Sequence, residues 1–277
     1  MTLAPLIKLN DGYSIPQLGL GTWPLDDEKV SAAVVRAVEA GYRHIDTAVK
    51  YGNEKGVGDG IKASGVDRED LFVTTKLDGE FQGNDRAAEG LDGSLQRLGL
   101  DYVDLLLIHW PLPARDEFIS TWKTFERLQA AGKVRSIGVS NFKPAHLERL
   151  LAETDVVPAV NQIQLSPAIT RTAERDFHSR LGIVTESYSP LGGSGGDLLS
   201  APILYQLGEK YEKTPAQVVL RWHIQQGLVT IPKSGNPERM RENLDVFDFA
   251  LDPLDLAEIA ILDEGPGAGN DSDATGH

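Results

Sequence analysis

The feature that most constrains the fold is an alternation, repeated along the chain, of short apolar runs with segments of helical period. Several of the runs are apolar almost throughout, as parallel strands covered on both faces are. Eight strands alternating with helices favour a closed (β/α)8 TIM barrel of the α/β class over a doubly wound sheet. The eight predicted strands are residues 17–22, 44–48, 71–76, 103–109, 134–140, 159–165, 183–189 and 228–234.

The segments between these runs place apolar side chains on one helical face. Val30, Val34 and Val38 form such a stripe, and Gly41 follows it as a helix stop. We interpret the stripes as packing onto the sheet. Turn residues between two short apolar runs predict a β-hairpin over residues 1–16, before the barrel. We expect a single barrel domain over 1–277, with extra helices near the C-terminus and a mobile tail at 264–277.

The composition excludes several classes of protein. The 277 residues suit one barrel, and 41% hydrophobic residues suffice for its core. The net charge of -14 disfavours nucleic acid and anionic membranes as partners. There are no cysteines, no metal-ligand spacing among the histidines, and no apolar run long enough for a membrane span. We therefore expect a cytoplasmic protein without a metal; its oligomeric state stays open, and a monomer fits the sequence.

Four groups able to exchange protons lie at consecutive predicted strand ends. Asp46 ends the second predicted strand and Tyr51 lies in the loop after it; Lys76 ends the third and His109 the fourth. Active sites of these barrels lie at the carboxyl ends of the strands. Singly, each residue has a structural explanation, such as a turn cap or a buried histidine. Together they predict one catalytic site.

The residue types suit proton donation to a carbonyl oxygen. A free tyrosine has a pKa of about 10, whereas a general acid works best near the operating pH of about 7. This gap corresponds to ~4 kcal/mol, roughly what a lysine ammonium supplies at about 4 Å and an effective dielectric near 20. We therefore expect Lys76 to lower the pKa of Tyr51, Asp46 to keep Lys76 charged, and His109 to orient the carbonyl.

Several motifs in order resemble those of the aldo-keto reductase superfamily, and within it the bacterial 2,5-diketo-D-gluconate reductase group. They are HIDTAVKYGNE (44–54), TTK (74–76), LLLIHWP (105–111) and IGVSN (137–141). IPKSGNPERMREN (231–243) is similar to the segment of that family that binds the adenosine phosphate. The likeness covers nearly the whole chain, from the hairpin to about residue 263, and implies an NADPH-dependent reductase.

The resemblance also implies which residues form the site. Asp46, Tyr51, Lys76 and His109 match the catalytic tetrad. The expected contacts to NADPH run from the cofactor channel, through the carboxamide, the nicotinamide ring and the pyrophosphate, to the 2′-phosphate and adenine. In that order they are Gly21 and Thr22; Ser140, Asn141 and Gln162; Tyr188; Leu191 and the glycines after it; Lys233, Ser234 and Arg239; and Glu242 and Asn243.

The segment 231–243 also indicates a phosphate site without the resemblance. It places Lys233, Arg239 and Arg241 within nine positions of an otherwise acidic chain. The loop after the eighth strand and the start of the next helix form a common phosphate site in barrels. Arg241 is not a signature position, and we expect it to face solvent.

The resemblance also indicates which residues line the substrate pocket. We expect Trp23 and Trp110 to form its walls near the catalytic groups. Asp78 stands where many relatives carry an aromatic residue, so a more polar wall that disfavours anionic substrates is predicted. The proposed reaction is reduction of small aldehydes, dicarbonyls or ketones to alcohols, with Tyr51 as general acid.

Two other functions remain open. Lys76 at a strand end could form a Schiff base, as in barrel aldolases, although the adjacent Asp46 would favour its unreactive ammonium form. A barrel that binds NADPH with little turnover could instead serve as a regulatory subunit.

Overall fold

In the computed structural model, which describes residues 3–193 and 196–276, eight parallel strands form one sheet that curls into a barrel. Strands neighbour one another in chain order from β3 to β10, as the alternating pattern predicts. The strands are β3 (Leu20–Gly21), β4 (His44–Asp46), β5 (Phe72–Leu77), β6 (Val103–Ile108), β7 (Val134–Ser140), β8 (Val160–Gln164), β9 (Val184–Tyr188) and β10 (Val229–Thr230).

The two ends of the sheet meet and close the barrel. Leu18 pairs with Thr230 and Gly21 with Lys233, both in parallel register. The Gly21 amide donates to the carbonyl of Pro232 at 3.2 Å. A Cβ on Gly21 would lie 2.6 Å from the carbonyl oxygen of Ile231, so only glycine allows the two chains to approach this closely.

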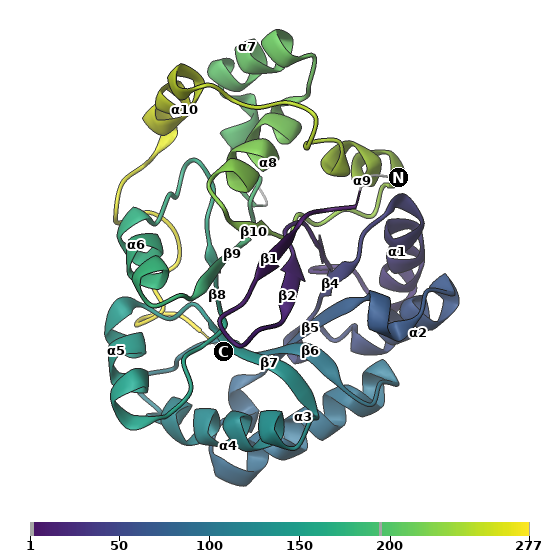
Figure 1. Ribbon diagram of the computed structural model, residues 1–277, viewed down its shortest axis with the longest axis vertical. Helices are drawn as coiled ribbons and strands as arrows, with labels where there is room; N and C mark the ends of the chain where they lie inside the picture. The colour runs from purple at the N-terminus through teal and green to yellow at the C-terminus, as the bar shows by residue number, and fades with distance from the viewer. Residues whose placement is uncertain (1–2, 194–195, 277) are drawn as a thin grey trace.

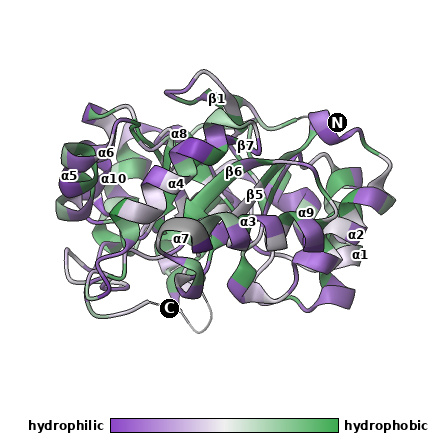
Figure 2. Ribbon diagram, turned by 90° about the horizontal axis from the view of Figure 1, so that it is seen from below, coloured by the Kyte–Doolittle hydropathy of each residue, from purple (hydrophilic) through white to green (hydrophobic). Residues whose placement is uncertain are grey.

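The helices surround the barrel (Figure 1). Their apolar stripes pack onto the outer face of the strands, as predicted. The α-helices of the described ranges are α1 (Asp27–Ala40), α2 (Glu54–Ser64), α3 (Asn84–Leu98), α4 (Phe118–Ala130), α5 (Pro144–Glu153), α6 (Thr172–Arg180), α7 (Pro202–Tyr211), α8 (Pro215–Gln225), α9 (Pro237–Leu244) and α10 (Pro253–Ile259). Figure 2 shows green, hydrophobic strands inside this ring, among helices of mixed colour. No helix in the described ranges is long and apolar enough to cross a membrane.

Helix ends follow the sequence signals. The Asp26 side chain accepts a hydrogen bond from the Lys29 amide and caps α1, and Gly41 ends that helix in the left-handed conformation. Extra helices α9 and α10 follow the last strand, as expected. Agreement between local signals and tertiary structure keeps the strand ends, and therefore the side chains on them, in defined positions.

The predicted hairpin consists of β1 (Leu6–Lys8) and β2 (Ser14–Pro16), which pair antiparallel. It lies across one end of the barrel, at the centre of Figure 1. Ile15 of the hairpin is wholly buried and packs with Leu105, Leu107 and Val229 from the barrel strands. The hairpin therefore covers the end where the parallel strands begin, and the carboxyl ends face the other way.

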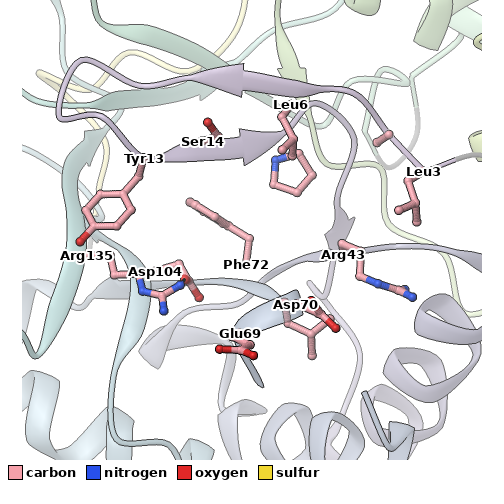
Figure 3. A pocket seen from close by; sticks show the side chains of 13 residues that line it. Leu3, Leu6, Tyr13, Ser14, Arg43, Glu69, Asp70, Phe72, Asp104 and Arg135 are labelled. Carbon is pink, nitrogen blue, oxygen red and sulfur yellow. Dashed lines mark hydrogen bonds and ion pairs between the residues drawn. The ribbon is translucent and has the colours of Figure 1, made fainter. Parts of the chain in front are cut away.

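A cavity of about 490 Å³ lies beneath this hairpin (Figure 3). Phe72, Asp104 and Arg135 line it from the amino ends of the strands. Its best-buried charge is already neutralised, because Asp104 forms ion pairs with Arg68 at 2.7 Å and Arg135 at 2.9 Å. We assign this cavity to the packing of the hairpin, since the groups predicted to act in catalysis lie at the opposite strand ends.

Candidate functional site

The four residues predicted to act together meet at the carboxyl ends of β4, β5 and β6. Asp46 ends β4, Lys76 lies near the end of β5, and His109 follows β6. Tyr51 ends the short 3-10 helix η1 (Val49–Tyr51), which leaves β4. The loop from β4 therefore turns back and places the phenol over the strand that it came from.

Lys76 is the centre of this group. Its Nζ donates to Asp46 Oδ1 at 2.6 Å, to the carbonyl oxygen of Thr47 at 3.0 Å, and to the hydroxyl oxygen of Tyr51 at 3.1 Å. The rings of Tyr51 and His109 meet edge to face, with centroids 5.8 Å apart. The Lys76 ammonium thus bridges the Asp46 carboxylate and the Tyr51 phenol, and the imidazole of His109 lies beside them.

Lys76 is wholly buried but stays charged. Burial alone would lower its pKa, but the charge of Asp46 and the contact with Tyr51 raise the pKa of Lys76 above its usual value. A lysine that forms a Schiff base must lose its proton at neutral pH. The geometry therefore argues against the aldolase alternative.

The predicted lowering of the pKa of Tyr51 is wrong for this structure. Burial raises the pKa of the phenol, and the charge of Lys76 opposes that rise without cancelling it. The loss of water around the buried ring outweighs the one favourable charge. Tyr51 therefore holds its proton firmly at neutral pH, as a donor must before a substrate oxygen accepts it.

A cavity of about 390 Å³ opens beside these residues. It runs from Asp46 and Tyr51 along the strand ends to the loop after β10, and it includes eight predicted site residues. These eight are Gly21, Thr22, Trp23, Asp46, Tyr51, Tyr188, Leu191 and Lys233. Gly193, one of the glycines expected near the pyrophosphate, borders the same cavity, as do five residues that were not predicted: Pro24, Ser189, Pro190, Ile231 and Pro232.

One buried polar group in this region fits a polar ligand such as NADPH. The Thr22 hydroxyl has no hydrogen-bond partner among the described residues, although it is buried at the cavity. A buried hydroxyl left open in this way is explained by a ligand that pairs with it. The side-chain nitrogen of Gln162 donates to Asp46 and to Glu186, so these two carboxyl groups contact its nitrogen and not its oxygen.

The residues predicted at the carboxamide lie together at the end of β7 and within β8, where Ser140 pairs with Gln162 in register. Asn141 adopts a left-handed conformation just after β7, which asparagine tolerates. Its side chain donates to the carbonyl of His109 at 3.1 Å and accepts from the hydroxyl of Tyr188 at 2.9 Å. The Ser140 hydroxyl donates to the carbonyl of Gln162 at 2.9 Å. Here Asn141 therefore holds two other predicted site residues in place.

The predicted phosphate segment forms the loop after β10 and the start of α9. Asn236 caps α9 by accepting from the amides of Glu238 and Arg239, and Asn236 and Ser234 bond to each other. The side chains of Lys233, Arg239 and Arg241 are exposed, and none forms an ion pair within the described residues. Glu242 is also exposed, whereas Asn243 is buried. Cations without an ion-pair partner, beside a helix N-terminus, suit a phosphate group.

Of the glycine-rich loop after Leu191, residues 194–195 lie outside the described ranges.

The three predicted pocket residues differ in their surroundings. Trp23 is 57% exposed and its ring lies 5.3 Å from that of Tyr51, whereas Trp110 is buried beside His109. Asp78 is also buried: it caps the 3-10 helix η3 (Gly79–Phe81) and lies 3.8 Å from the ammonium of Lys50. Asp78 thus has a local structural partner that the sequence did not reveal, and its influence on substrate charge stays a prediction.

The C-terminal segment, expected to be a mobile tail, lies against the barrel. Asn270 donates to the Tyr188 hydroxyl at 2.9 Å, and its backbone amide donates to Gln164. Lys143 forms ion pairs with Asp271 at 2.5 Å and Asp273 at 2.6 Å. In Figure 2 the C-terminus and the hairpin lie at opposite ends of the molecule. The tail therefore reaches the end of the barrel that carries the predicted site, and its mobility stays a prediction.

Within the described part of the chain, no group of three or more histidine, aspartate or glutamate side chains could hold a metal ion. The predicted site residues instead form one hydrogen-bonded acid–base group beside an elongated cavity. That arrangement suits proton transfer to a ligand held along the strand ends.

Comparisons with known proteins show which family this chain resembles. Residues 17–264 match the model of the aldo/keto reductase family. An aldo-keto reductase of Mycolicibacterium smegmatis is 52% identical over 269 residues, 97% of each chain. The methylglyoxal reductase DkgA of Escherichia coli is 48% identical over 271 residues, 98% of each chain.

Solved structures are similar over the same length. An aldo/keto reductase from Brucella melitensis superposes with a TM-score of 0.90 at 50% identity, covering 94% of this chain and all of that one. A mutant of Gox0644 in complex with NADPH gives a TM-score of 0.94 at 43% identity, with both chains fully covered. The barrel described above is therefore the fold of these enzymes.

Proposed function

The chain belongs to the aldo/keto reductase family, and we propose that it reduces small aldehydes, dicarbonyls and ketones with Tyr51 as the proton donor. It is an NADPH-dependent oxidoreductase that acts on carbonyl compounds. One observation carries the proposed role of Tyr51: the buried ammonium of Lys76 contacts both the Asp46 carboxylate and the Tyr51 hydroxyl, beside the cavity.

In the proposed reaction the cofactor and the protein have different roles. NADPH, when bound, supplies the hydride for the carbonyl carbon. Tyr51 gives its proton to the carbonyl oxygen, and the adjacent Lys76 charge stabilises the phenolate that forms. Asp46 keeps Lys76 charged, and His109, edge-on to Tyr51, orients the oxygen. A phenol with a raised pKa resists ionisation before the substrate arrives, so donation occurs only as the oxyanion develops.

Gln162 and Tyr188 would hold the nicotinamide end of NADPH, and Lys233, Ser234 and Arg239 its 2′-phosphate. The place of Tyr188 at the cavity and the exposed cations before and within α9 support these assignments. No residue in this arrangement needs to be covalently modified. The small-molecule carbonyl would lie near the proposed proton donor, between Tyr51, His109 and the wall formed by Trp23 and Trp110.

The substrate class rests on relatives and on the site. Several relatives near 48% identity are named methylglyoxal reductases, and methylglyoxal is a small dicarbonyl. Trp23 is more than half exposed beside Tyr51, so this side of the site is open to small molecules of varied shape. We expect broad specificity with methylglyoxal among the substrates.

The proposal is tested by following NADPH absorbance with a panel of carbonyl compounds that includes methylglyoxal and an aromatic aldehyde. We expect oxidation of NADPH with several members of the panel, and no product from NADPH alone. A protein that binds NADPH but oxidises it with none of these compounds would support the regulatory-barrel alternative instead. Trapping of a substrate on Lys76 by borohydride would support the aldolase.

The coenzyme preference depends on the exposed cations of α9. Arg239→Ala is expected to weaken NADPH binding by roughly 10- to 100-fold, the cost of losing a hydrogen bond to a charged group, and to change NADH binding little. Arg241→Ala is the matched control, because Arg241 is also exposed on α9 and lies outside the predicted contacts. The measurement is the dissociation constant of each coenzyme by fluorescence titration. Equal losses for NADPH and NADH would remove Arg239 from the 2′-phosphate site.

A further inference from the structure

A second buried acid lies inside the barrel next to the group formed by Asp46, Tyr51, Lys76 and His109. Glu186, on β9, has no exposed surface. Its Oε2 accepts a hydrogen bond from Gln162 Nε2 at 3.0 Å, and the same nitrogen donates to Asp46 Oδ2 at 2.9 Å. Because β4 and β9 are not neighbours in the sheet, this contact crosses the interior of the barrel.

One amide group thus bridges two carboxyl groups. Asp46 uses its other oxygen to accept from Lys76, which in turn contacts Tyr51. A continuous chain of hydrogen bonds therefore runs from Glu186 through Gln162, Asp46 and Lys76 to the phenol. Since the Asp46 carboxylate can only accept, the amide of Gln162 presents Nε2 to it, with the amide oxygen directed away.

Among the described residues, no free cation is left near Glu186 to neutralise a second carboxylate. The cation whose charge acts on Glu186, Lys76 on β5, is already paired with Asp46 on β4. His44, also on β4, has its Nε2 3.6 Å from Glu186 Oε1, but burial lowers the pKa of His44 to about 3 and keeps it neutral. Gln162 on β8 and Val229 on β10, which pairs with Glu186 in register, carry no charge.

Burial and the nearby charge of Asp46 raise the pKa of Glu186 to about 8. Among the described residues, Glu186 Oε1 has no hydrogen-bond partner, although the atom is buried. A carboxylate with one oxygen in this position would be an unpaired buried charge, which proteins avoid by protonation. Protonation removes that unpaired charge and leaves Oε2 as the acceptor for the Gln162 N–H.

We propose that Glu186 is a positioning residue that works as a neutral carboxylic acid, fixing the amide of Gln162 and, through it, the carboxylate of Asp46. This inference rests on the proposed function of the Asp46–Lys76–Tyr51 group. While Glu186 is neutral, the Gln162 oxygen stays available to a ligand, and the negative charge of Asp46 and the positive charge of Lys76 balance each other. When it ionises, its negative charge acts on the same hydrogen-bonded chain and makes Tyr51 a weaker acid.

The test compares wild-type enzyme with Glu186→Gln and Glu186→Leu, using NADPH and methylglyoxal from about pH 6 to about pH 10. Glutamine copies the neutral acid, so at neutral pH we expect kcat within about twofold of wild type. Leucine removes the acceptor and leaves a buried amide N–H unpaired, so kcat should fall roughly tenfold and KM for NADPH should rise. In wild type, kcat should decline with an apparent pKa of about 8, and in Glu186→Gln this decline should move to higher pH.

Two results would overturn the proposal: an unchanged alkaline decline in Glu186→Gln, or wild-type kcat and KM in Glu186→Leu. Infrared spectroscopy adds a readout that does not depend on turnover. Wild-type protein at neutral pH should show the carbonyl stretch of a protonated carboxylic acid, and Glu186→Gln should lack it. If the wild-type enzyme reduced no carbonyl, the proposed function would fail. The infrared band would still decide whether Glu186 is neutral.

Discussion

Replacement of Tyr51 by phenylalanine is expected to lower kcat for carbonyl reduction by about 10²- to 10⁴-fold, the usual contribution of a general acid. The phenol is the proposed proton source, and the hydroxyl contacts the protein through the ammonium of Lys76. NADPH affinity should change little, because Tyr51→Phe keeps the ring that borders the cavity. Steady-state kinetics and a fluorescence titration of NADPH measure the two effects separately.

Tyr205→Phe provides the control for this variant. Tyr205 lies on α7 and is 56% exposed, so the same loss of a hydroxyl there should leave kcat unchanged. A fully active Tyr51→Phe enzyme would remove Tyr51 as the acid. A parallel loss of NADPH binding would instead indicate that the hydroxyl supports the cofactor cavity.

Replacement of Lys76 by methionine is expected to lower both activity and stability. It leaves the Asp46 carboxylate buried without its cation, and breaking such a pair costs about 3–5 kcal/mol. Catalysis should fall as well, because no charge remains to stabilise the phenolate of Tyr51. Denaturant unfolding gives the free energy of unfolding, and NADPH oxidation gives the rate.

A double variant separates these two effects. Asp46→Asn combined with Lys76→Met removes both charges, and Asn keeps an acceptor for Gln162. We expect the double variant to recover most of the lost stability, because a neutral pair of similar volume replaces the isolated charge. Its activity should stay low. Recovery of activity together with stability would mean that the Lys76 charge is not needed in the reaction.

The barrel and the four strand-end residues could be predicted because both follow from local patterns. Apolar runs and helical stripes specify strands and helices, and the carboxyl ends of parallel strands meet at one face. Asp46, Lys76 and His109 therefore had to converge once the strands were placed. Tyr51 followed because the loop after a barrel strand returns to the same face.

Other features of the site depend on how deeply each side chain is buried, which the pattern of residues along the sequence does not show. The run IVTESYS shows an acid inside a predicted strand, yet only the closed barrel brings Glu186 to Gln162. The pKa of Tyr51 rises because burial outweighs one favourable charge. Asp78 caps the 3-10 helix η3 and lies near the ammonium of Lys50, and both contacts form only when the loops fold.

The most direct test of the central claim is the methylglyoxal assay run with NADPH that carries deuterium at both positions of nicotinamide C4. If hydride passes directly from the cofactor to the carbonyl carbon, each molecule of alcohol should contain one deuterium on the newly formed carbinol carbon. Mass spectrometry of the product measures this label. A product that contains no deuterium at that carbon would contradict direct hydride transfer, and with it the proposed role of Tyr51 as the partner acid.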